Sequence, residues 1–231
     1  MSYVFAAPVQ AAVPVSGQDA LFPVHRIYCV GRNYVDHAKE MGHTGREAPF
    51  FFMKPADAVL PVAAGTTGEL SYPAQTDDFQ HEMELVVAIG KGGSEIAVEG
   101  ALEHVWGYAI GLDMTRRDVQ GAAKKLGRPW DTGKAFEQSA PIGPITPAAQ
   151  AGDIGRAAIT LQVNGAVRQS STIDMLIWNV AETIADLSKY FTLQPGDLIY
   201  TGTPAGVAAV RRGDELAGTI TGLGELRLKV V

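Results

Sequence analysis

Short apolar segments that end at glycine or proline recur along the whole chain, and they constrain its fold more than any other feature. Residues 27–30, 50–53 and 198–200 are runs of this kind. Glycine contributes 26 and proline 13 of the 231 residues, so few segments are long enough for a helix of several turns. The pattern predicts an α+β fold that is mainly β, with many short strands and a few short helices.

The length favours one domain over residues 1–231, with two small domains as the alternative. Nothing in the sequence marks a linker or an internal repeat. Residues 1–24 are apolar with proline interruptions, which predicts an extended segment packed on that domain.

Local signals place one hairpin and several helices. Asn164-Gly165 between two apolar-polar segments predicts a tight hairpin. Asn179, with Glu182 three residues later, has the pattern of a capping box and predicts a helix to about Tyr190. Helices are also expected over 34–41 and 115–126, the second capped by Thr115 and ended by Gly127, whereas 128–157 are expected to be mostly irregular.

Composition excludes several classes of protein. The formal net charge of −6 disfavours a nucleic-acid-binding domain. Cys29 is the one cysteine, so disulfide scaffolds and cysteine-based zinc sites are excluded, and its apolar strand favours a core thiol over a nucleophile. We expect no signal peptide, because Pro8 and Pro14 interrupt an N-terminus without early Lys or Arg, and no membrane span. A cytoplasmic protein is therefore expected.

Three carboxylates stand out in otherwise apolar strands. Residues 81–89 alternate so that Glu82 and Glu84 share one face, about 6–7 Å apart at Cα. Asp113 ends the apolar run 105–112, where an acid is costly unless it is paired or binds a metal. An all-oxygen site of this kind suits Mg²⁺, Mn²⁺ or Ca²⁺. A solvated strand face would explain the Glu pair equally well.

His37 and Glu40 are three residues apart on the expected helix 34–41, so they share a face. A carboxylate beside an imidazole raises its basicity, as in a general base for water. An ordinary surface His–Glu pair is the alternative.

Four further positions have the right chemistry for a substrate site. Lys134 could neutralise an oxyanion or a substrate carboxylate, although a solvated loop lysine explains it as well. Arg117 and Gln120 are three residues apart on a helix that follows Asp113, and could point at the same cation or form plain helix surface. The turn Thr201–Pro204 offers hydroxyls and amides that could hold a carboxylate, although an ordinary tight turn explains it as well.

Taken in order, these segments resemble the fumarylacetoacetate hydrolase family over about residues 25–231. The motifs that carry the resemblance are Gly31-Arg32-Asn33-Tyr34 with His37 and Glu40, Phe52-Met53-Lys54-Pro55, His81-Glu82-Met83-Glu84-Leu85, Leu112–Gln120, Gly127-Arg128-Pro129-Trp130 up to Lys134, and Thr201-Gly202-Thr203-Pro204. The length is similar to that of the short members of the family.

The resemblance implies a mixed β-sandwich roll, a homodimer and a metal site. It implies that Glu82, Glu84 and Asp113 bind a divalent metal, Mg²⁺ or Mn²⁺, with Ca²⁺ able to substitute in crystals. His37 and Glu40 match the family's water-activating dyad, on a lid helix around residues 33–47, and Lys134 matches the lysine that stabilises the charged intermediate. Arg32, Arg117, Gln120 and Thr203 fall in segments that the family uses around the substrate.

The implied reaction is metal-dependent hydrolysis of a C–C bond in a 3-acylpyruvate, with fumarylpyruvate, and so a gentisate-type degradation of aromatic compounds, as the leading expectation. A small-molecule 2-oxo acid would then be the partner. A second carboxylate on that substrate would need a spare cation such as Arg116 or Arg128. The alternatives are oxaloacetate decarboxylation, general acylpyruvate hydrolysis, isomerisation or hydration of related oxo-dienoic acids, and a binding protein without activity.

Overall fold

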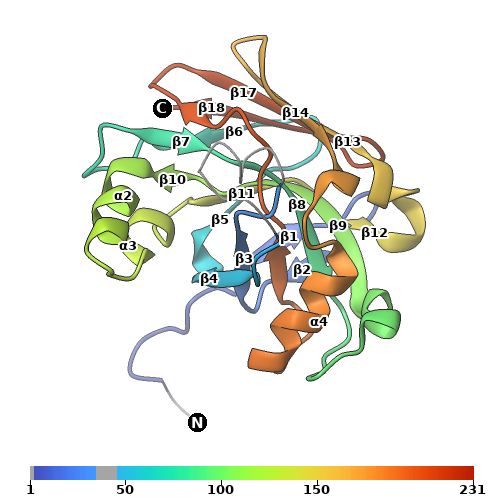
Figure 1. The fold of residues 1–231 in the computed structure, drawn as a ribbon. Helices are drawn as coiled ribbons and strands as arrows, with labels where there is room; N and C mark the ends of the chain where they lie inside the picture. The colour runs from blue at the N-terminus through green and yellow to red at the C-terminus, as the bar shows by residue number, and fades with distance from the viewer. Residues whose placement is uncertain (1–2, 35–45) are drawn as a thin grey trace.

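The fold is mainly β, with two large sheets packed against each other and short helices at their margins (Figure 1). The computed structural model describes residues 3–34 and 46–231. The larger sheet has eight strands, in the order β4 (Phe50–Lys54), β3 (Ile27–Gly31), β15 (Leu198–Tyr200), β8 (Met83–Ile89), β9 (Val105–Leu112), β11 (Ala140–Ile142) and β5 (Val59–Pro61), with β12 (Thr146–Pro147) paired to β9.

The second sheet has five strands, in the order β14 (Ala166–Thr172), β13 (Ala158–Val163), β17 (Glu215–Ile220), β18 (Gly224–Val230) and β6 (Thr67–Leu70). Two small sheets complete the strands: β10 (Thr115–Arg116), β7 (Phe79–His81) and β16 (Ala208–Ala209) form one, and β1 (Ala12–Pro14) and β2 (Leu21–Pro23) form the other. Parallel pairs β3–β15, β5–β11 and β6–β18 stand among antiparallel ones, so both large sheets are mixed.

The helices are short. Within residues 3–34 and 46–231, the α-helices are α2 (Arg117–Lys125), α3 (Asp131–Lys134) and α4 (Val180–Tyr190), and 3₁₀ turns cover 56–58, 98–104, 148–150, 154–156 and 173–175. Figure 1 shows α2 and α3 together on one side of the sheets and α4 at another margin. Among the described residues, no helix has the length and apolar character needed to cross a bilayer.

Strand β8 is buried on both faces and organises the interior. Met83, Leu85 and Val87 belong to a core that also contains Ile159 and Leu161 of the five-stranded sheet. Val86 belongs to a second core, which includes Cys29 and is closed by the β1–β2 hairpin through residues such as Val13. Since side chains alternate along a strand, Glu84 lies on the same face as Val86, away from the main core. The predicted alternation of residues 81–89 is therefore confirmed.

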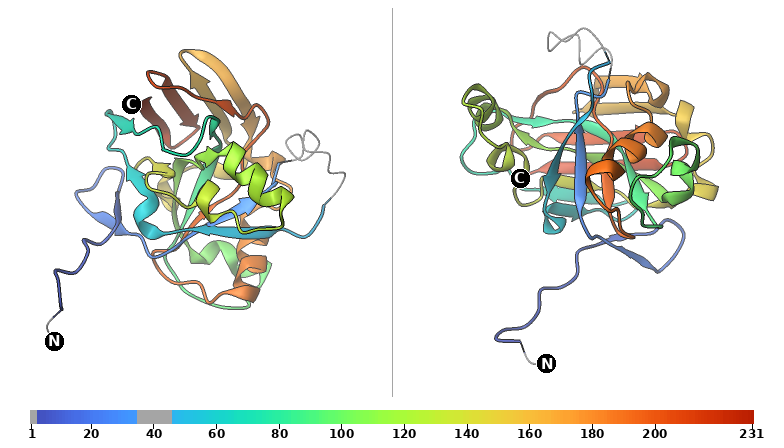
Figure 2. Two further views of the ribbon diagram at one scale, coloured as in Figure 1. Left: turned by 90° about the vertical axis from the view of Figure 1, so that its left-hand side faces the viewer. Right: turned by 60° about the horizontal axis from the view of Figure 1, so that its bottom comes forward.

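The ends of the N-terminal segment behave differently. Val13, Phe22 and Val24 are buried, whereas Tyr3 to Phe5 are at least three-quarters exposed. Figure 2 shows these first residues running away from the body of the protein. The prediction that residues 1–24 pack on the domain therefore does not describe the first residues of the segment.

The hairpin turn at Asn164-Gly165 and the helix cap at Asn179 are confirmed. Asn164 and Gly165 have φ of +52° and +77°, as a two-residue hairpin turn with left-handed central residues requires, and join β13 to β14. Asn179 caps α4: its side chain accepts from the Glu182 N–H at 3.0 Å, and the Glu182 carboxylate accepts from the Asn179 N–H at 3.0 Å. Cys29 is a fully buried free thiol, as its strand predicts, and burial raises its pKa well above the usual value.

Two predicted boundaries are wrong. The helix expected from Thr115 begins at Arg117, because Thr115 and Arg116 pair with Gln80 and Phe79 as strand β10. Residues 131–134, expected to be irregular, form the single turn α3, in which Lys134 N–H donates to Trp130 O at 2.9 Å. The helix expected over 34–41 lies, except for Tyr34, outside the described residues.

Replacing Asn179 by alanine should lower the free energy of unfolding by about 1 kcal/mol, because it removes the acceptor for one N–H at the start of α4. Equilibrium urea unfolding measures the change. Asn179→Asp keeps an acceptor at the same position and should remain close to the wild type. Equal losses in both variants would contradict a capping role.

Candidate active site

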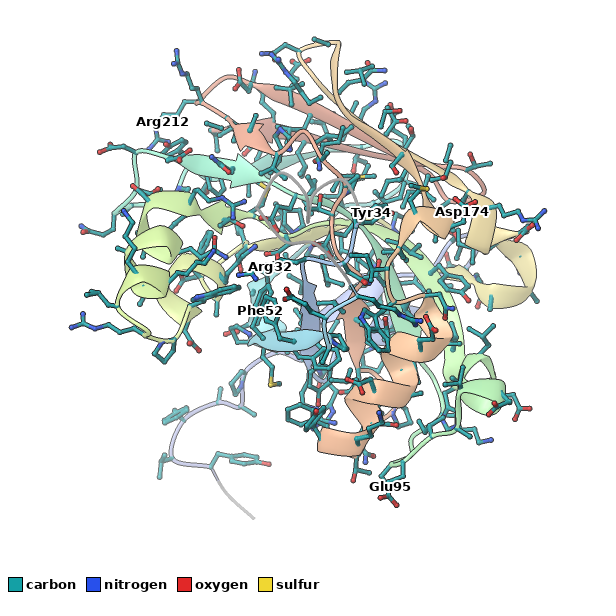
Figure 3. All side chains as sticks on the ribbon, viewed as in Figure 1. Arg32, Tyr34, Phe52, Glu95, Asp174 and Arg212 are labelled. Atoms are coloured by element: carbon teal, nitrogen blue, oxygen red, sulfur yellow. The ribbon has the colours of Figure 1, made fainter. Side chains whose placement is uncertain are left out.

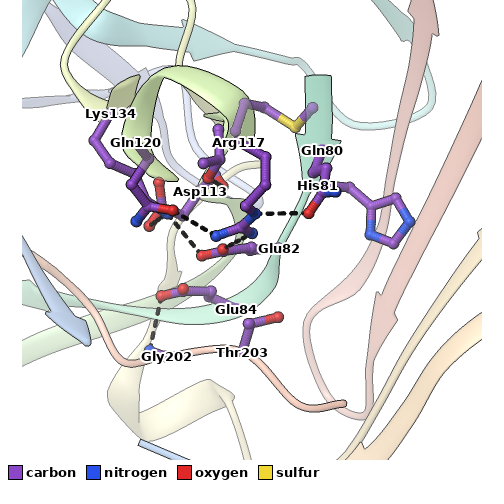
Figure 4. A network of polar contacts seen from close by, with 12 residues as sticks. Gln80, His81, Glu82, Glu84, Asp113, Arg117, Gln120, Lys134, Gly202 and Thr203 are labelled. Carbon is purple, nitrogen blue, oxygen red and sulfur yellow. Dashed lines mark hydrogen bonds and ion pairs between the residues drawn. The ribbon is translucent and has the colours of Figure 1, made fainter. Parts of the chain in front are cut away.

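The three carboxylates predicted from the sequence converge beside the central strands of the larger sheet (Figure 4). Glu82 lies between β7 and β8, Glu84 lies on β8, and Asp113 directly follows β9. The antiparallel pairing of β8 with β9 brings them together, and the Asp113 N–H donates to Glu82 O at 2.8 Å. One ligand oxygen from each carboxylate lies within 4.8 Å of the others, and none of the three residues is more than 7% exposed.

Cationic side chains neutralise two of the three carboxylates. Lys134, on α3, places its ammonium 2.8 Å from Glu82 Oε2 and 2.7 Å from Asp113 Oδ2. Arg117, on α2, donates to Glu82 Oε1, and its other nitrogens donate to Gln80 and Gln120, both at 2.7 Å. Lys134 is 2% exposed, so the alternative of a solvated loop lysine is wrong.

Lys54 is a site residue that the sequence analysis quoted in a motif without giving it a role. It is 1% exposed on β4, and its ammonium lies 2.9 Å from Asp113 Oδ1. It also donates to the main-chain carbonyl of Lys134, which ties β4 to α3. The signal was available, because a lysine at the end of an apolar strand needs a buried partner.

Glu84 is the carboxylate without a cation partner among the described residues. It accepts a hydrogen bond from the Gly202 N–H at 2.8 Å. Burial, followed by the negative charges of Asp113 and Glu82, raises the pKa of Glu84 well above its usual value. One amide of the 201–204 turn thus holds a carboxylate of the protein itself, whereas the sequence predicted that the turn could hold a carboxylate of the substrate.

Glu82 shows the opposite behaviour. Burial would raise its pKa, but the charges of Lys134 and Arg117 and their hydrogen bonds hold the pKa of Glu82 well below the usual range. Burial likewise opposes the charge on Lys134, and Asp113 and Glu82 outweigh it, so the pKa of Lys134 is raised. The ionised forms of this pair are therefore favoured, and Glu84 is left as the carboxylate that lacks a counter-charge.

These residues form a buried acidic triad that could bind a divalent metal ion. The donors are all carboxylate oxygens, which suits a hard cation such as Mg²⁺ or Mn²⁺. A cation at this position would supply the counter-charge that Glu84 lacks. The chemistry and the charge balance of the site therefore fit the predicted metal.

A pocket opens over the triad. Its lining combines the triad with Arg32, Arg117, Gln120, Lys124, Lys134, Thr203 and an apolar wall, which consists of Val30, Gly31, Phe50, Phe52 and Trp130. Trp130 contacts Phe50 and Phe52, with ring centroids 5.4 and 5.7 Å apart. Each of the four predicted substrate-binding residues, Arg32, Arg117, Gln120 and Thr203, therefore lines the pocket.

Arg32 lies at the end of β3, on the same side of the molecule as Phe52 (Figure 3). Its backbone φ is +56°, a left-handed conformation that costs free energy in a residue other than glycine. Its guanidinium lies 5.3 Å from the centroid of the Phe50 ring. The spare cations expected from the sequence, Arg116 and Arg128, do not line the pocket, and Arg116 is placed over Phe136 instead, 4.3 Å from the ring centroid.

The predicted dyad, His37 and Glu40, lies outside the described residues, and so does most of the predicted lid helix. The described residues on both sides of that segment contact Trp178. The Asn33 side chain donates to Trp178 O at 2.9 Å and accepts from its N–H at 2.8 Å. On the other side, the Trp178 indole donates to Glu47 O at 3.0 Å, and Arg46 lies 4.4 Å from the ring centroid.

Comparisons with known proteins found similar sequences over most of this chain. Residues 26–231 match the family model "Fumarylacetoacetate (FAA) hydrolase C-terminal". A fumarylpyruvate hydrolase from Ralstonia sp. is 50% identical over 184 residues, which cover 80% of this chain and 93% of that protein. An oxaloacetate tautomerase from Escherichia coli K12 is 41% identical over 202 residues, covering 87% and 90%.

A solved structure is similar over the whole chain. The crystal structure of fumarylpyruvate hydrolase from Pseudomonas aeruginosa in complex with Mn²⁺ and pyruvate has a TM-score of 0.98 and 59% identity, and the alignment covers 100% of this chain and 99% of that one. The chain belongs to the fumarylacetoacetate hydrolase family, and it is an enzyme of that family. The predicted resemblance is therefore confirmed.

Replacing Glu84 by glutamine should stabilise the protein in EDTA at pH 8, because glutamine is neutral at every pH, whereas burial without a cation partner disfavours ionisation of Glu84. Because the pKa of Glu84 is raised, the folded protein binds this proton more tightly than the unfolded chain does. Wild-type stability in EDTA should therefore fall as pH rises above about 4.3, the usual Glu value, and the variant should lose that dependence. Thermal unfolding from pH 5 to 8 measures both.

The matched control is Glu82→Gln. The same change should destabilise the protein in EDTA by roughly 3–5 kcal/mol, since it leaves Lys134 and Arg117 facing a neutral group. Added MnCl₂ should raise the melting temperature of the wild type and have little effect on either variant. Changes of the same sign in EDTA would contradict the assignment of Glu84 as the unpaired carboxylate.

Proposed function

We propose that this protein is a divalent-metal-dependent hydrolase that cleaves a C–C bond of a 3-acylpyruvate, with fumarylpyruvate, giving fumarate and pyruvate, as the substrate. The observation that carries the proposal is the buried triad, with Lys134 between Glu82 and Asp113 at the base of a pocket. The likeness to two fumarylpyruvate hydrolases, one of them in complex with Mn²⁺ and pyruvate, supports the choice of substrate.

Glu82, Glu84 and Asp113 would hold the metal, which supplies a Lewis acid for the carboxylate and ketone oxygens of the 2-oxo acid. In the proposed mechanism, Glu40 orients His37, which accepts a proton from water. The water oxygen bonds to the distal carbonyl carbon, and the C–C bond breaks with its electron pair moving to the pyruvate enolate. Lys134 stabilises the enolate oxygen with its positive charge, and protonation at carbon releases pyruvate.

Two pocket cations have no carboxylate partner among the described residues, namely Arg32 and Lys124. By contrast, Arg117 and Lys134 form ion pairs with Glu82. The cations Arg32 and Lys124 support a substrate with a second carboxylate, as fumarylpyruvate has. We therefore assign to Arg32 and Lys124 the role that the sequence analysis gave to Arg116 or Arg128.

Oxaloacetate chemistry is the second candidate, because the Escherichia coli tautomerase is 41% identical over most of both chains. Tautomerisation and decarboxylation both need an enolate to be stabilised and need no activated water. The same metal and Lys134 would serve them. Decarboxylation therefore differs from hydrolysis in its need for His37 as a base for water.

The deciding experiment is a paired assay with EDTA, Mg²⁺ or Mn²⁺. One set of reactions follows loss of the enol absorbance of fumarylpyruvate and acetylpyruvate, and the other follows tautomerisation of oxaloacetate and pyruvate formation from it. Metal-dependent turnover that is fastest on fumarylpyruvate is expected. Turnover confined to oxaloacetate would replace the proposed hydrolase with the second candidate.

His37→Ala should abolish hydrolysis, with a loss of roughly 10²–10⁴-fold in kcat, the usual contribution of a general base. Decarboxylation of oxaloacetate, which needs no activated water, should be spared. Equal losses in both reactions would show that His37 positions the substrate and does not activate water.

Lys124→Ala should raise KM for fumarylpyruvate roughly twofold to fivefold and leave acetylpyruvate unchanged, as expected when an exposed ion pair is lost. Lys125→Ala is the matched control, since the neighbouring lysine does not line the pocket. An equal effect of Lys124→Ala on both substrates would argue against binding of a second carboxylate.

A homodimer and a cytoplasmic location belong to the same proposal. Tyr3, Val4 and Phe5 are between 75% and 96% exposed, and a second copy of the chain could cover such an apolar segment. The buried free thiol of Cys29 is compatible with a reducing compartment. Sedimentation equilibrium of the full chain and of a variant lacking residues 1–9 measures the assembly.

A further inference from the structure

Gln169 is a buried polar residue that the mechanism above does not use. It is 1% exposed, and it is the one buried residue of strand β14, whose other side chains are exposed or half-buried. Its side chain reaches from the five-stranded sheet to the start of β8 and to the turn 201–204, where Thr203 lines the pocket.

The Gln169 amide uses its full hydrogen-bonding capacity. Its Oε1 accepts from the Met83 N–H at 3.0 Å and lies 3.0 Å from His81 Nδ1. Its Nε2 donates to Thr203 Oγ1 at 2.7 Å and to Pro204 O at 2.8 Å. A side-chain amide offers two acceptor positions and two donors, so none remains.

Two main-chain groups fix the orientation of this amide. The Met83 N–H is only a donor and must face Oε1, and the Pro204 carbonyl is only an acceptor and must face Nε2. If the amide were flipped, its NH₂ group would face the Met83 N–H and its oxygen would face the Pro204 carbonyl. Such unsatisfied groups inside a buried site are costly. The group that faces the Thr203 hydroxyl is therefore an N–H.

This orientation determines what the Thr203 hydroxyl can do. Its oxygen accepts from Gln169, so its own hydrogen must point elsewhere. Within the described residues, Thr203 Oγ1 makes no other hydrogen bond, and the residue is 3% exposed against the pocket. A buried hydroxyl hydrogen without a partner is costly, and an acceptor oxygen in the pocket would satisfy it.

We infer that Gln169 is a positioning residue that fixes the Thr203 hydroxyl as a hydrogen-bond donor into the pocket, where it binds a carboxylate or ketone oxygen of a 2-oxo acid. This rests on the proposed function for the ligand class, whereas the direction of the hydroxyl follows from the protein alone. The same amide also joins the main chain between Glu82 and Glu84 to the turn that carries Thr203. It therefore fixes the position of the Thr203 hydroxyl relative to the carboxylate triad.

A double-mutant cycle with pyruvate as the probe tests the inference. The dissociation constant for pyruvate is measured in excess Mn²⁺ for the wild type, Gln169→Met, Thr203→Val and the double variant. Methionine matches the size of glutamine and cannot donate, so the Thr203 hydroxyl loses the hydrogen bond that fixes its direction. Gln169→Met should weaken binding about tenfold when Thr203 is present and less than about twofold in the Thr203→Val background.

Equal losses in both backgrounds would overturn the inference, because a merely structural role of Gln169 does not depend on the hydroxyl. Gln162→Met, the same change at an exposed position of β13, should bind pyruvate as the wild type does. Melting temperature and Mn²⁺ affinity are measured for each variant, so a general loss of structure is recognised.

Neutron diffraction of deuterated crystals tests the same point without any ligand. The expected nuclear density has a deuterium on Gln169 Nε2 facing Thr203, and the Thr203 deuterium directed into the pocket. A Thr203 deuterium directed at Gln169 would overturn the inference. If the wild type bound no pyruvate, the ligand class in the proposed function would be wrong, and the neutron map would decide the hydroxyl direction by itself.

Discussion

The rest of the structure depends on the burial of three carboxylates side by side between central strands. Isolated buried charges are unfavourable, and four elements around Glu82, Glu84 and Asp113 supply a counter-charge or a hydrogen-bond donor. Helix α2 supplies Arg117, α3 supplies Lys134, and β4 supplies Lys54. The least compensated carboxylate, Glu84, is the one that a metal cation would complete.

The mixed sheet provides a rigid support for this cluster of buried charges. Strand β8 is covered on both faces, so the site has a rigid base of hydrogen-bonded backbone and little access to water apart from the pocket. The turn 201–204 follows β15, the neighbour of β8, and contacts β8 through Thr201, Gly202 and Gln169. The three carboxylates, their cation partners and the Thr203 hydroxyl are thus held by neighbouring elements around β8.

Much of the site was predictable, because it consists of charged residues that are unusual in or next to apolar strands. Two acids in the run 81–89 and one directly after the apolar run 105–112 predicted the triad, and the Asn179–Glu182 spacing predicted the start of α4. Lys134 was ambiguous, since a lysine beside glycine suits a solvated loop as well as a buried ion pair. Lys54 and Gln169 were given no role, because their partners are 59 and 34 or more residues away along the chain, in segments whose pairing no local pattern specifies.

The sequence by itself determined the local elements: strand alternation, the hairpin at Asn164-Gly165, the cap of α4 and the residue types of the site, since these depend on neighbours a few positions apart. The tertiary structure decided which cation meets which carboxylate, why Thr115 pairs as a strand instead of capping a helix, and which hydroxyl faces the pocket. Those outcomes follow from the pairing of strands distant along the chain. That pairing sets the distances between the groups and their burial. Distance and burial in turn determine which ion pairs form and which group donates each hydrogen bond.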